Sequence, residues 1–212
     1  MVHDAPIAMR ERLFLFSILA TTGLSAYLLL NHHPPFTPHL LPMTPLDEAT
    51  PFWVWTVWPY ALLWLSNFIL PFCIRGRENF LQMAVTFLVA LGILVVFWAL
   101  WPTTFPRPPA PAGGSFTEEF YLLFVSVDRP LNCFPSGHIT MPAMLLYFIC
   151  RERPRKAVWI WTMFAFFSLS IFTTKQHYVW DLFGGLLTTF IALRASQWWR
   201  ESRRLSETLG DP

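Results

Sequence analysis

The chain has 212 residues, 54% of them hydrophobic and 13% charged, with a formal net charge of +2 at pH 7. Soluble domains carry a charge on roughly a quarter of their residues, so this composition excludes an ordinary soluble protein and indicates an integral membrane protein. The small net charge and the lack of a basic stripe with interleaved aromatic residues also argue against a nucleic-acid partner.

Six apolar segments approach the roughly 20 residues that a helix needs to cross a membrane. They are Leu13–Leu30, Phe52–Ile74, Phe80–Trp101, His138–Cys150, Ala157–Thr174 and Val179–Trp199. The first follows two arginines but lacks a small-residue cleavage site, so we interpret it as a membrane helix rather than a signal peptide. The sequence therefore predicts an all-α bundle of six transmembrane helices, forming a single domain over residues 1–212.

Basic residues gather on one side of this predicted bundle. Of the 15 Lys and Arg residues, all but three precede the first span, follow the second or fourth span, or lie at the end of the sixth span and beyond it. The positive-inside rule makes that side cytoplasmic, with both termini and tails of about residues 1–12 and 200–212. Small size and short loops point to a bacterial inner (plasma) membrane. The three exceptions, Arg107, Arg129 and Lys175, fall on the periplasmic or extracellular side, where they are candidates for holding an anion.

Two loops on that side are long enough to carry function. The first outer loop, Asn31–Pro51, contains three histidines with Asp47 and Glu48, but no helical spacing organises them. We expect a solvated irregular loop there, with a metal site as the alternative. The second outer loop, Pro102–Pro135, contains a Ser115-x-x-Glu118 capping box, which predicts a short apolar helix lying in the membrane interface.

The stretch Cys133-Phe-Pro135-Ser136-Gly137-His138 begins the fourth span. Ser136 can cap the helix, and free backbone N–H groups at a helix start, together with the positive end of the helix dipole, form a site for a phosphate. His138 would carry out proton chemistry on it. Because this span is short, His138 is expected at the depth of the lipid head groups. Cys133 is interpreted as a small filler residue, with a thiol nucleophile as the alternative.

A second candidate lies at the start of the sixth span, where His177 and Asp181 are four residues apart. On a helix start this spacing lets the carboxylate orient the imidazole. His138, His177 and Asp181 could instead bind zinc. The three outer cations suit an anion rather than Zn²⁺, which favours the phosphate interpretation.

At these residues the chain resembles the type 2 phosphatidic acid phosphatase superfamily. The family pattern is Lys-x6-Arg-Pro, then Pro-Ser-Gly-His, then Ser-Arg-x5-His-x3-Asp. Pro135–His138 gives the second part, and His177 with Asp181 gives the end of the third. Arg107-Pro108 fits the first part, but Leu100 stands at its Lys position, and Ile171 stands at the Arg position of the third. The missing Arg and the His-Tyr-x-x-Asp sequence resemble the branch with sphingomyelin and inositol phosphorylceramide synthases.

The resemblance implies a metal-independent phosphatase that acts on a membrane lipid phosphate or diphosphate and needs no cofactor. His177, oriented by Asp181, would attack phosphorus and form a phosphohistidine, and His138 would protonate the leaving group. Substrate phosphate would be held by Arg107, Ser136, Gly137, Arg129 and Lys175, the last two compensating for the missing cations. Two alternatives stay open: a lipid phosphotransferase, and an inactive relative that binds lipid or acts as a scaffold. The sequence leaves the oligomeric state open.

Overall fold

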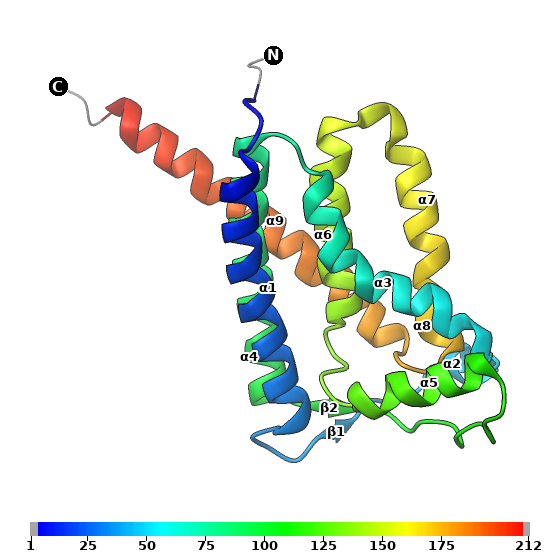
Figure 1. Ribbon diagram of the computed structural model, residues 1–212. Helices are drawn as coiled ribbons and strands as arrows, with labels where there is room; N and C mark the ends of the chain where they lie inside the picture. Colours follow the sequence, from blue (N-terminus) through cyan, green and yellow to red (C-terminus); the bar gives the residue numbers. More distant parts are fainter. Residues whose placement is uncertain (1–3, 210–212) are drawn as a thin grey trace.

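The computed structural model describes residues 4–209, with side chains for residues 4–203, and this part is mostly helical (Figure 1). The bundle consists of α1 (Met9–His32), α3 (Val57–Ile69), α4 (Arg77–Leu100), α6 (Gly137–Glu152), α7 (Ala157–Ser168) and α9 (Val179–Leu209). Short segments extend these helices or cross the outer loops: α2 (Pro45–Ala49), η1 (Val54–Thr56), η2 (Leu70–Cys73), α5 (Phe116–Val127), η3 (Pro154–Lys156) and α8 (Ser170–Thr173). Two-residue strands, β1 (His39–Leu40) and β2 (Thr103–Thr104), pair in parallel and join the two outer loops.

Within residues 4–209, four helical segments are long and apolar enough to cross a membrane: Met9–His32, Val54–Cys73, Arg77–Leu100 and Pro154–Thr173. They match the first, second, third and fifth predicted spans. The helix α6 has only 16 residues, and the apolar part of α9 carries Asp181 and Arg194. Four candidate spanning helices are compatible with an integral membrane protein, while the fourth and sixth spans stay predictions.

The ends of the helices follow the predicted distribution of basic residues. The first turn of α1, the last turn of α9 and the connection from α6 to α7 lie at one end of the molecule, opposite α5 and the two strands (Figure 1). At that end Arg153 Nη2 donates to the carbonyl of Cys73 at 3.3 Å, so two of the basic connections meet. That this end is cytoplasmic stays a prediction, and residues 1–3, residues 210–212 and the Arg204 side chain lie outside the described part.

The helices α4, α6 and α9 form the centre of the bundle, and glycines let them approach closely. A Cβ atom on Gly185 of α9 would lie 2.9 Å from the carbonyl oxygen of Ser136, and one on Gly184 would overlap the ring of Phe134. A Cβ on Gly137 would lie 3.2 Å from the Trp98 ring of α4. Trp98 Nε1 also donates to the carbonyl of Pro135 at 3.1 Å. The loop that starts α6 is therefore fixed between α4 and α9.

The outer loops are more ordered than expected. The capping box predicted at Ser115 and Glu118 is confirmed, and α5 follows it. The expectation of a solvated irregular first loop is wrong at Asp47, which is 1% exposed. Its carboxylate forms a second capping box with Thr44 at the start of α2 and also accepts the N–H of Val179 at 3.0 Å. An acidic side chain at the positive end of two helices satisfies free N–H groups, so the loop packs onto the start of α9.

Candidate active site

His177 and Asp181 form the expected pair at the start of α9. His177 Nδ1 lies 3.2 Å from Asp181 Oδ2, and the same oxygen accepts the N–H of Tyr178 at 2.9 Å. The chain reaches this point through a turn in which Lys175 has a φ of 53°, in the left-handed region. His177 is 4% exposed and Asp181 is fully buried. The carboxylate therefore fixes the ring so that Nε2 is directed away from it.

Ser136 faces that nitrogen. Its Oγ lies 3.4 Å from His177 Nε2, and its N–H donates to the carbonyl of Asp181 at 3.2 Å. The expectation that its hydroxyl caps α6 is wrong: within the described residues Ser136 occupies the N-cap position without a side-chain capping bond. The hydroxyl is instead buried beside the imidazole. It can donate to a group bound at Nε2.

His138 completes the group on the first turn of α6. Its ring centroid lies 5.2 Å from that of His177, and the side chain is 5% exposed. Its Nε2 lies 3.5 Å from Asp128 Oδ2, an ion-pair distance that is slightly too long for a well-formed hydrogen bond. The structure thus brings both predicted histidines, Ser136 and Gly137 together around one space.

Asp128, the C-cap residue of α5, is a member of this site that sequence reasoning missed. Its carboxylate accepts hydrogen bonds from the hydroxyls of Tyr27 in α1 and Tyr60 in α3. Burial by itself raises the pKa of Asp128, but the contact and charge of His138, the Tyr27 hydroxyl and the charge of His177 together bring it below its ordinary value. The carboxylate is therefore ionised at neutral pH, and four elements converge on it.

Arg107 is the predicted cation that contacts residues of this site, namely Asp128 and Gln176. One Nη donates to Gln176 Oε1 at 2.8 Å and to the carbonyl of Asp128, and the other donates to the carbonyl of Val125 at 3.0 Å. Its Nε is buried and has no hydrogen-bond partner within the described part of the chain. The guanidinium thus joins the end of α5 to the residue before His177 and keeps one unpaired donor.

Tyr178, the residue after His177, binds the segment of the second outer loop that leads to Arg107. The hydroxyl of Tyr178 donates to the carbonyl of Pro106 at 3.0 Å, and its ring meets Phe105 edge to face. Burial, with the charges of Asp47 and Asp181, raises the pKa of Tyr178 to about 12. The hydroxyl therefore stays protonated and keeps the second outer loop on the turn that carries His177.

The other two predicted cations make contacts elsewhere. Lys175 Nζ donates to the carbonyl of Asp47 at 2.7 Å; burial lowers the pKa of Lys175, an effect that the charge of Asp47 opposes. Arg129 is exposed, and its Nη1 lies 3.4 Å from the carbonyl of His32. Either side chain would have to leave a carbonyl partner to reach a phosphate, so their role as substrate ligands stays a prediction.

The two positions where family cations are missing have different surroundings. Leu100 is 68% exposed at the end of α4, whereas Ile171 is fully buried in a cluster with Tyr60 and Ile139. The carbonyl of Ile171 accepts the N–H of His177 at 3.1 Å. An apolar side chain therefore supports the turn of His177 from behind.

The cysteines show no sign of nucleophilic chemistry. Cys73, Cys133 and Cys150 are free. Burial and the charges of Asp181 and Asp128 raise the pKa of Cys133 well above its ordinary value, which keeps the thiol protonated.

Among the described residues, no group of three or more His, Cys, Asp or Glu side chains is arranged to hold a metal ion.

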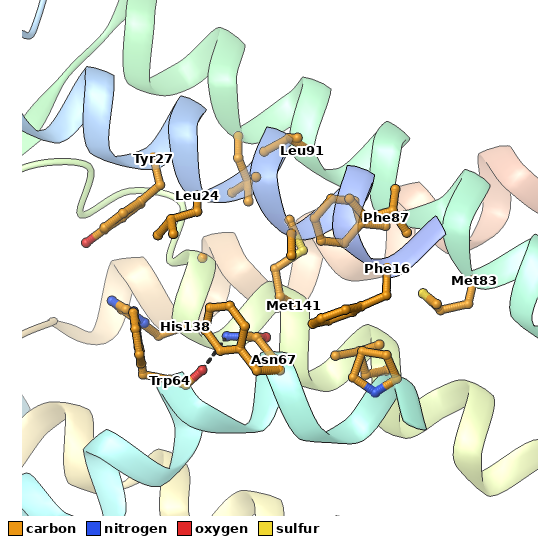
Figure 2. A pocket seen from close by; sticks show the side chains of 18 of the residues that line it. Phe16, Leu24, Tyr27, Trp64, Asn67, Met83, Phe87, Leu91, His138 and Met141 are labelled. Carbon is orange, nitrogen blue, oxygen red and sulfur yellow. Dashed lines mark hydrogen bonds between the residues drawn. The ribbon is translucent and has the colours of Figure 1, made fainter. Parts of the chain in front are cut away.

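An apolar cavity opens from the site toward the middle of the bundle (Figure 2). His138, Tyr27 and Trp64 stand at one end of it, and Phe16 and Met83 stand at the other. The site therefore consists of a buried polar end, with two histidines, two carboxylates and an arginine, and an apolar extension.

Comparison with known proteins gives one family. Residues 38–195, which contain every motif residue named above, match the PAP2 superfamily. A search of curated proteins finds no match to the chain. The resemblance expected from Pro135–His138, His177 and Asp181 is confirmed.

Proposed function

This chain belongs to the PAP2 superfamily, which supports phosphatase-type activity in general, and we propose that it is a lipid phosphatase embedded in the membrane. In this proposal it has six spans, its site faces the periplasm or cell exterior, and it hydrolyses a lipid phosphate or diphosphate without a metal ion. The observation that carries the proposal is the pairing of His177 Nδ1 with Asp181, which leaves Nε2 free beside Ser136.

In the first step His177 Nε2 attacks phosphorus. A nitrogen–phosphorus bond forms, the bond from phosphorus to the lipid oxygen breaks, and the electron pair leaves on that oxygen. Asp181 stabilises the positive charge that develops on the imidazole, as carboxylates do in other catalytic pairs. His138, protonated beside the Asp128 carboxylate, gives its proton to the leaving oxygen, so a lipid alcohol or a shorter phosphate departs.

In the second step water attacks the phosphohistidine. His138, now neutral, takes a proton from this water, the nitrogen–phosphorus bond breaks, and inorganic phosphate leaves with His177 restored. The equatorial oxygens are neutralised in both steps by the unpaired Nε–H of Arg107, the hydroxyl of Ser136 and the backbone N–H groups that start α6. We keep Arg129 and Lys175 as additional ligands that exchange their carbonyl partners for the substrate.

The test is release of inorganic phosphate from a panel of lipid phosphates by detergent-solubilised protein in EDTA. We expect release by the wild-type protein and a loss of about 10⁴-fold or more in His177→Ala, the scale seen when a covalent nucleophile is removed. His33→Ala is the matched control, because His33 is exposed on the first outer loop. Equal release by wild type and His177→Ala contradicts the proposal.

Phosphotransfer is the second candidate, and Ile171 favours it because this position matches the branch of lipid phosphotransferases. Incubation with paired donor and acceptor lipids distinguishes the two. A transferase moves the head group or phosphate only when the acceptor is present, whereas a phosphatase releases phosphate in its absence. An inactive relative does neither, and His177→Ala then leaves its cellular phenotype unchanged.

A further inference from the structure

The apolar cavity beside His138 is bounded by two helix pairs. Helix α1 packs on α4 and helix α3 packs on α6, and the cavity of about 120 Å³ lies between the pairs. Its walls are almost wholly apolar away from the end at His138 and Tyr27, with Asn67 as the exception (Figure 2). A cavity of this size and lining is known to stay dry and to accept an apolar ligand, because water finds no polar partners there.

Helix α1 gives the cavity its depth. Tyr27, Leu24, Ala20 and Phe16 follow one another along its inner face at intervals of three or four residues, from the His138 end toward the cytoplasmic half. The eleven steps along the helix from Phe16 to Tyr27 span about 16 Å at about 1.5 Å per residue. At the far end the ring of Phe16 forms the floor together with Phe80 and Met83, and it is held from outside the cavity by Phe72, with 5.0 Å between the ring centroids.

Gly23 sets the width at mid-depth. A Cβ atom placed there would lie 2.9 Å from Cζ of Phe87, which lines the opposite wall. Any side chain at this position has to displace the Phe87 ring. By contrast, Gly92 on α4 is a position where a Cβ meets no described atom within 4 Å. The two glycines therefore form a matched pair for blocking the cavity or leaving it open.

We propose that this cavity holds one hydrocarbon chain of the phosphate substrate, which enters between α1 and α3, and that its floor limits the length of that chain. The inference rests on the proposed function, because the occupant is identified by continuity with His138, where the phosphate ester is cleaved. A single chain fits because the space runs along one helix face and ends at Phe16. Lipid tails are as apolar as the lining, so selection acts through steric fit rather than through hydrophobic gain.

The kinetic test compares butyl phosphate with hexadecyl phosphate in mixed micelles. In Gly23→Leu we expect the ratio of the two kcat/KM values to shift about tenfold against the long chain, because the leucine fills the path. Gly92→Leu is expected to leave the ratio unchanged. Ala20→Phe, which narrows the cavity nearer its floor, serves as a second variant should Gly23→Leu fail to fold. An unchanged ratio in every folded cavity variant overturns the proposal.

A second measurement needs no turnover. His177→Ala protein is irradiated with hexadecyl phosphate that carries a diazirine at the end of its chain, and labelled residues are mapped by mass spectrometry. We expect labels on Phe16, Leu19 and Phe87, their loss with added Gly23→Leu, and their retention with added Gly92→Leu. Labels spread evenly over the outer faces of the helices overturn the chain site. If wild type cleaves butyl phosphate but cavity labelling fails, the result supports the phosphatase activity and contradicts the chain site. If labelling succeeds without any cleavage, the result supports the chain site and contradicts the phosphatase activity.

Discussion

The two histidines of the site are each paired with a carboxylate, but the pairs are built differently. His177 and Asp181 lie one turn apart around the start of a single helix, at 3.2 Å through Nδ1. His138 and Asp128 come from different elements and lie 3.5 Å apart through Nε2, with Tyr27 and Tyr60 on the same carboxylate. The first pair is a local feature of the chain, and the second is a product of the whole outer end of the bundle.

This difference matches the roles we propose. A nucleophile must keep one tautomer and one orientation throughout the reaction, and a carboxylate four residues along the chain, in the first turn of α9, provides that. A proton donor must change its charge during the cycle. The negative charge beside His138 is that of the Asp128 carboxylate. Two tyrosine hydroxyls donate to this carboxylate, and an Nη of Arg107 donates to the backbone carbonyl of Asp128. The predictions below separate the two pairs by the size of the effect.

Breaking the local pair should have the largest effect. In Asp181→Asn we expect kcat to fall about 10⁴-fold, because the amide permits the wrong imidazole tautomer, as the same change does in a Ser-His-Asp triad. The measurement is phosphate release at saturating substrate. Glu48→Gln, an exposed acid-to-amide change in the first outer loop, is the control. A loss below about tenfold would show that Asp181 does not orient the nucleophile.

Replacement of Arg107, which contacts both Asp128 and Gln176, should have the second-largest effect. For Arg107→Gln we expect a loss in kcat of about 10² to 10³, the cost of one preorganised donor to a transition-state oxyanion. Lys175→Gln and Arg129→Gln should cost less, because their present partners are the carbonyls of Asp47 and His32. The three variants are compared for kcat on one substrate. An equal loss in Lys175→Gln would show that Lys175 replaces a missing family cation.

Breaking the assembled pair should cost about 10²-fold in kcat for Asp128→Asn, part of the usual contribution of a positioned acid and base. The loss should be smaller for a substrate with a good leaving group, such as an aryl phosphate, which needs little protonation. A purely structural role for Asp128 predicts equal losses for both substrates. That pattern would remove His138 and Asp128 from the proton-transfer step.

The same residue gives a pH dependence of stability. The pKa of Asp128 is lower in the folded protein than its ordinary value of 3.8, so its ionised form contributes to stability above that value. This contribution is lost as pH falls below 3.8 toward the folded-state pKa. The difference in apparent melting temperature between wild type and Asp128→Asn should therefore shrink in acid as pH falls below 3.8. A difference that is independent of pH down to this range contradicts the ionised state of Asp128.

Much of this site could be predicted from sequence because it is encoded locally. Pro135–His138 and the His177–Asp181 spacing are short motifs, and the Ser115 capping box depends on two residues three apart. The four helices that are long and apolar enough to cross a membrane follow from apolar runs of sufficient length. Features of this kind need no knowledge of which helices are neighbours.

The rest could not be predicted because it depends on tertiary neighbours. Asp128 belongs to no motif of the sequence, and only packing of α5 on α1 and α3 brings it to Tyr27, Tyr60 and His138. We expected Asp47 to be solvated because nothing in the sequence around it shows that its carboxylate accepts the N–H of Val179. The one available signal for Asp128 was its place after a capped helix and directly before Arg129-Pro130.

The smallest effects should come from the hydroxyls on Asp128. Hydrogen bonds to a charged group contribute about 1.5 to 3 kcal/mol, but Asp128 keeps a second tyrosine when one is removed. We therefore expect Tyr60→Phe, whose bond is 3.3 Å long, to lower kcat only about threefold. Tyr27→Phe should have an effect of similar size, because it removes the other hydroxyl that donates to Asp128. Tyr147→Phe, which loses a contact with Gln197 outside the site, controls for the loss of a part-buried hydroxyl.

If the double variant Tyr27→Phe/Tyr60→Phe loses no more than the product of the single losses, the two hydroxyls act independently. A larger loss shows that they hold one carboxylate together, which is what distinguishes the assembled pair from the local one.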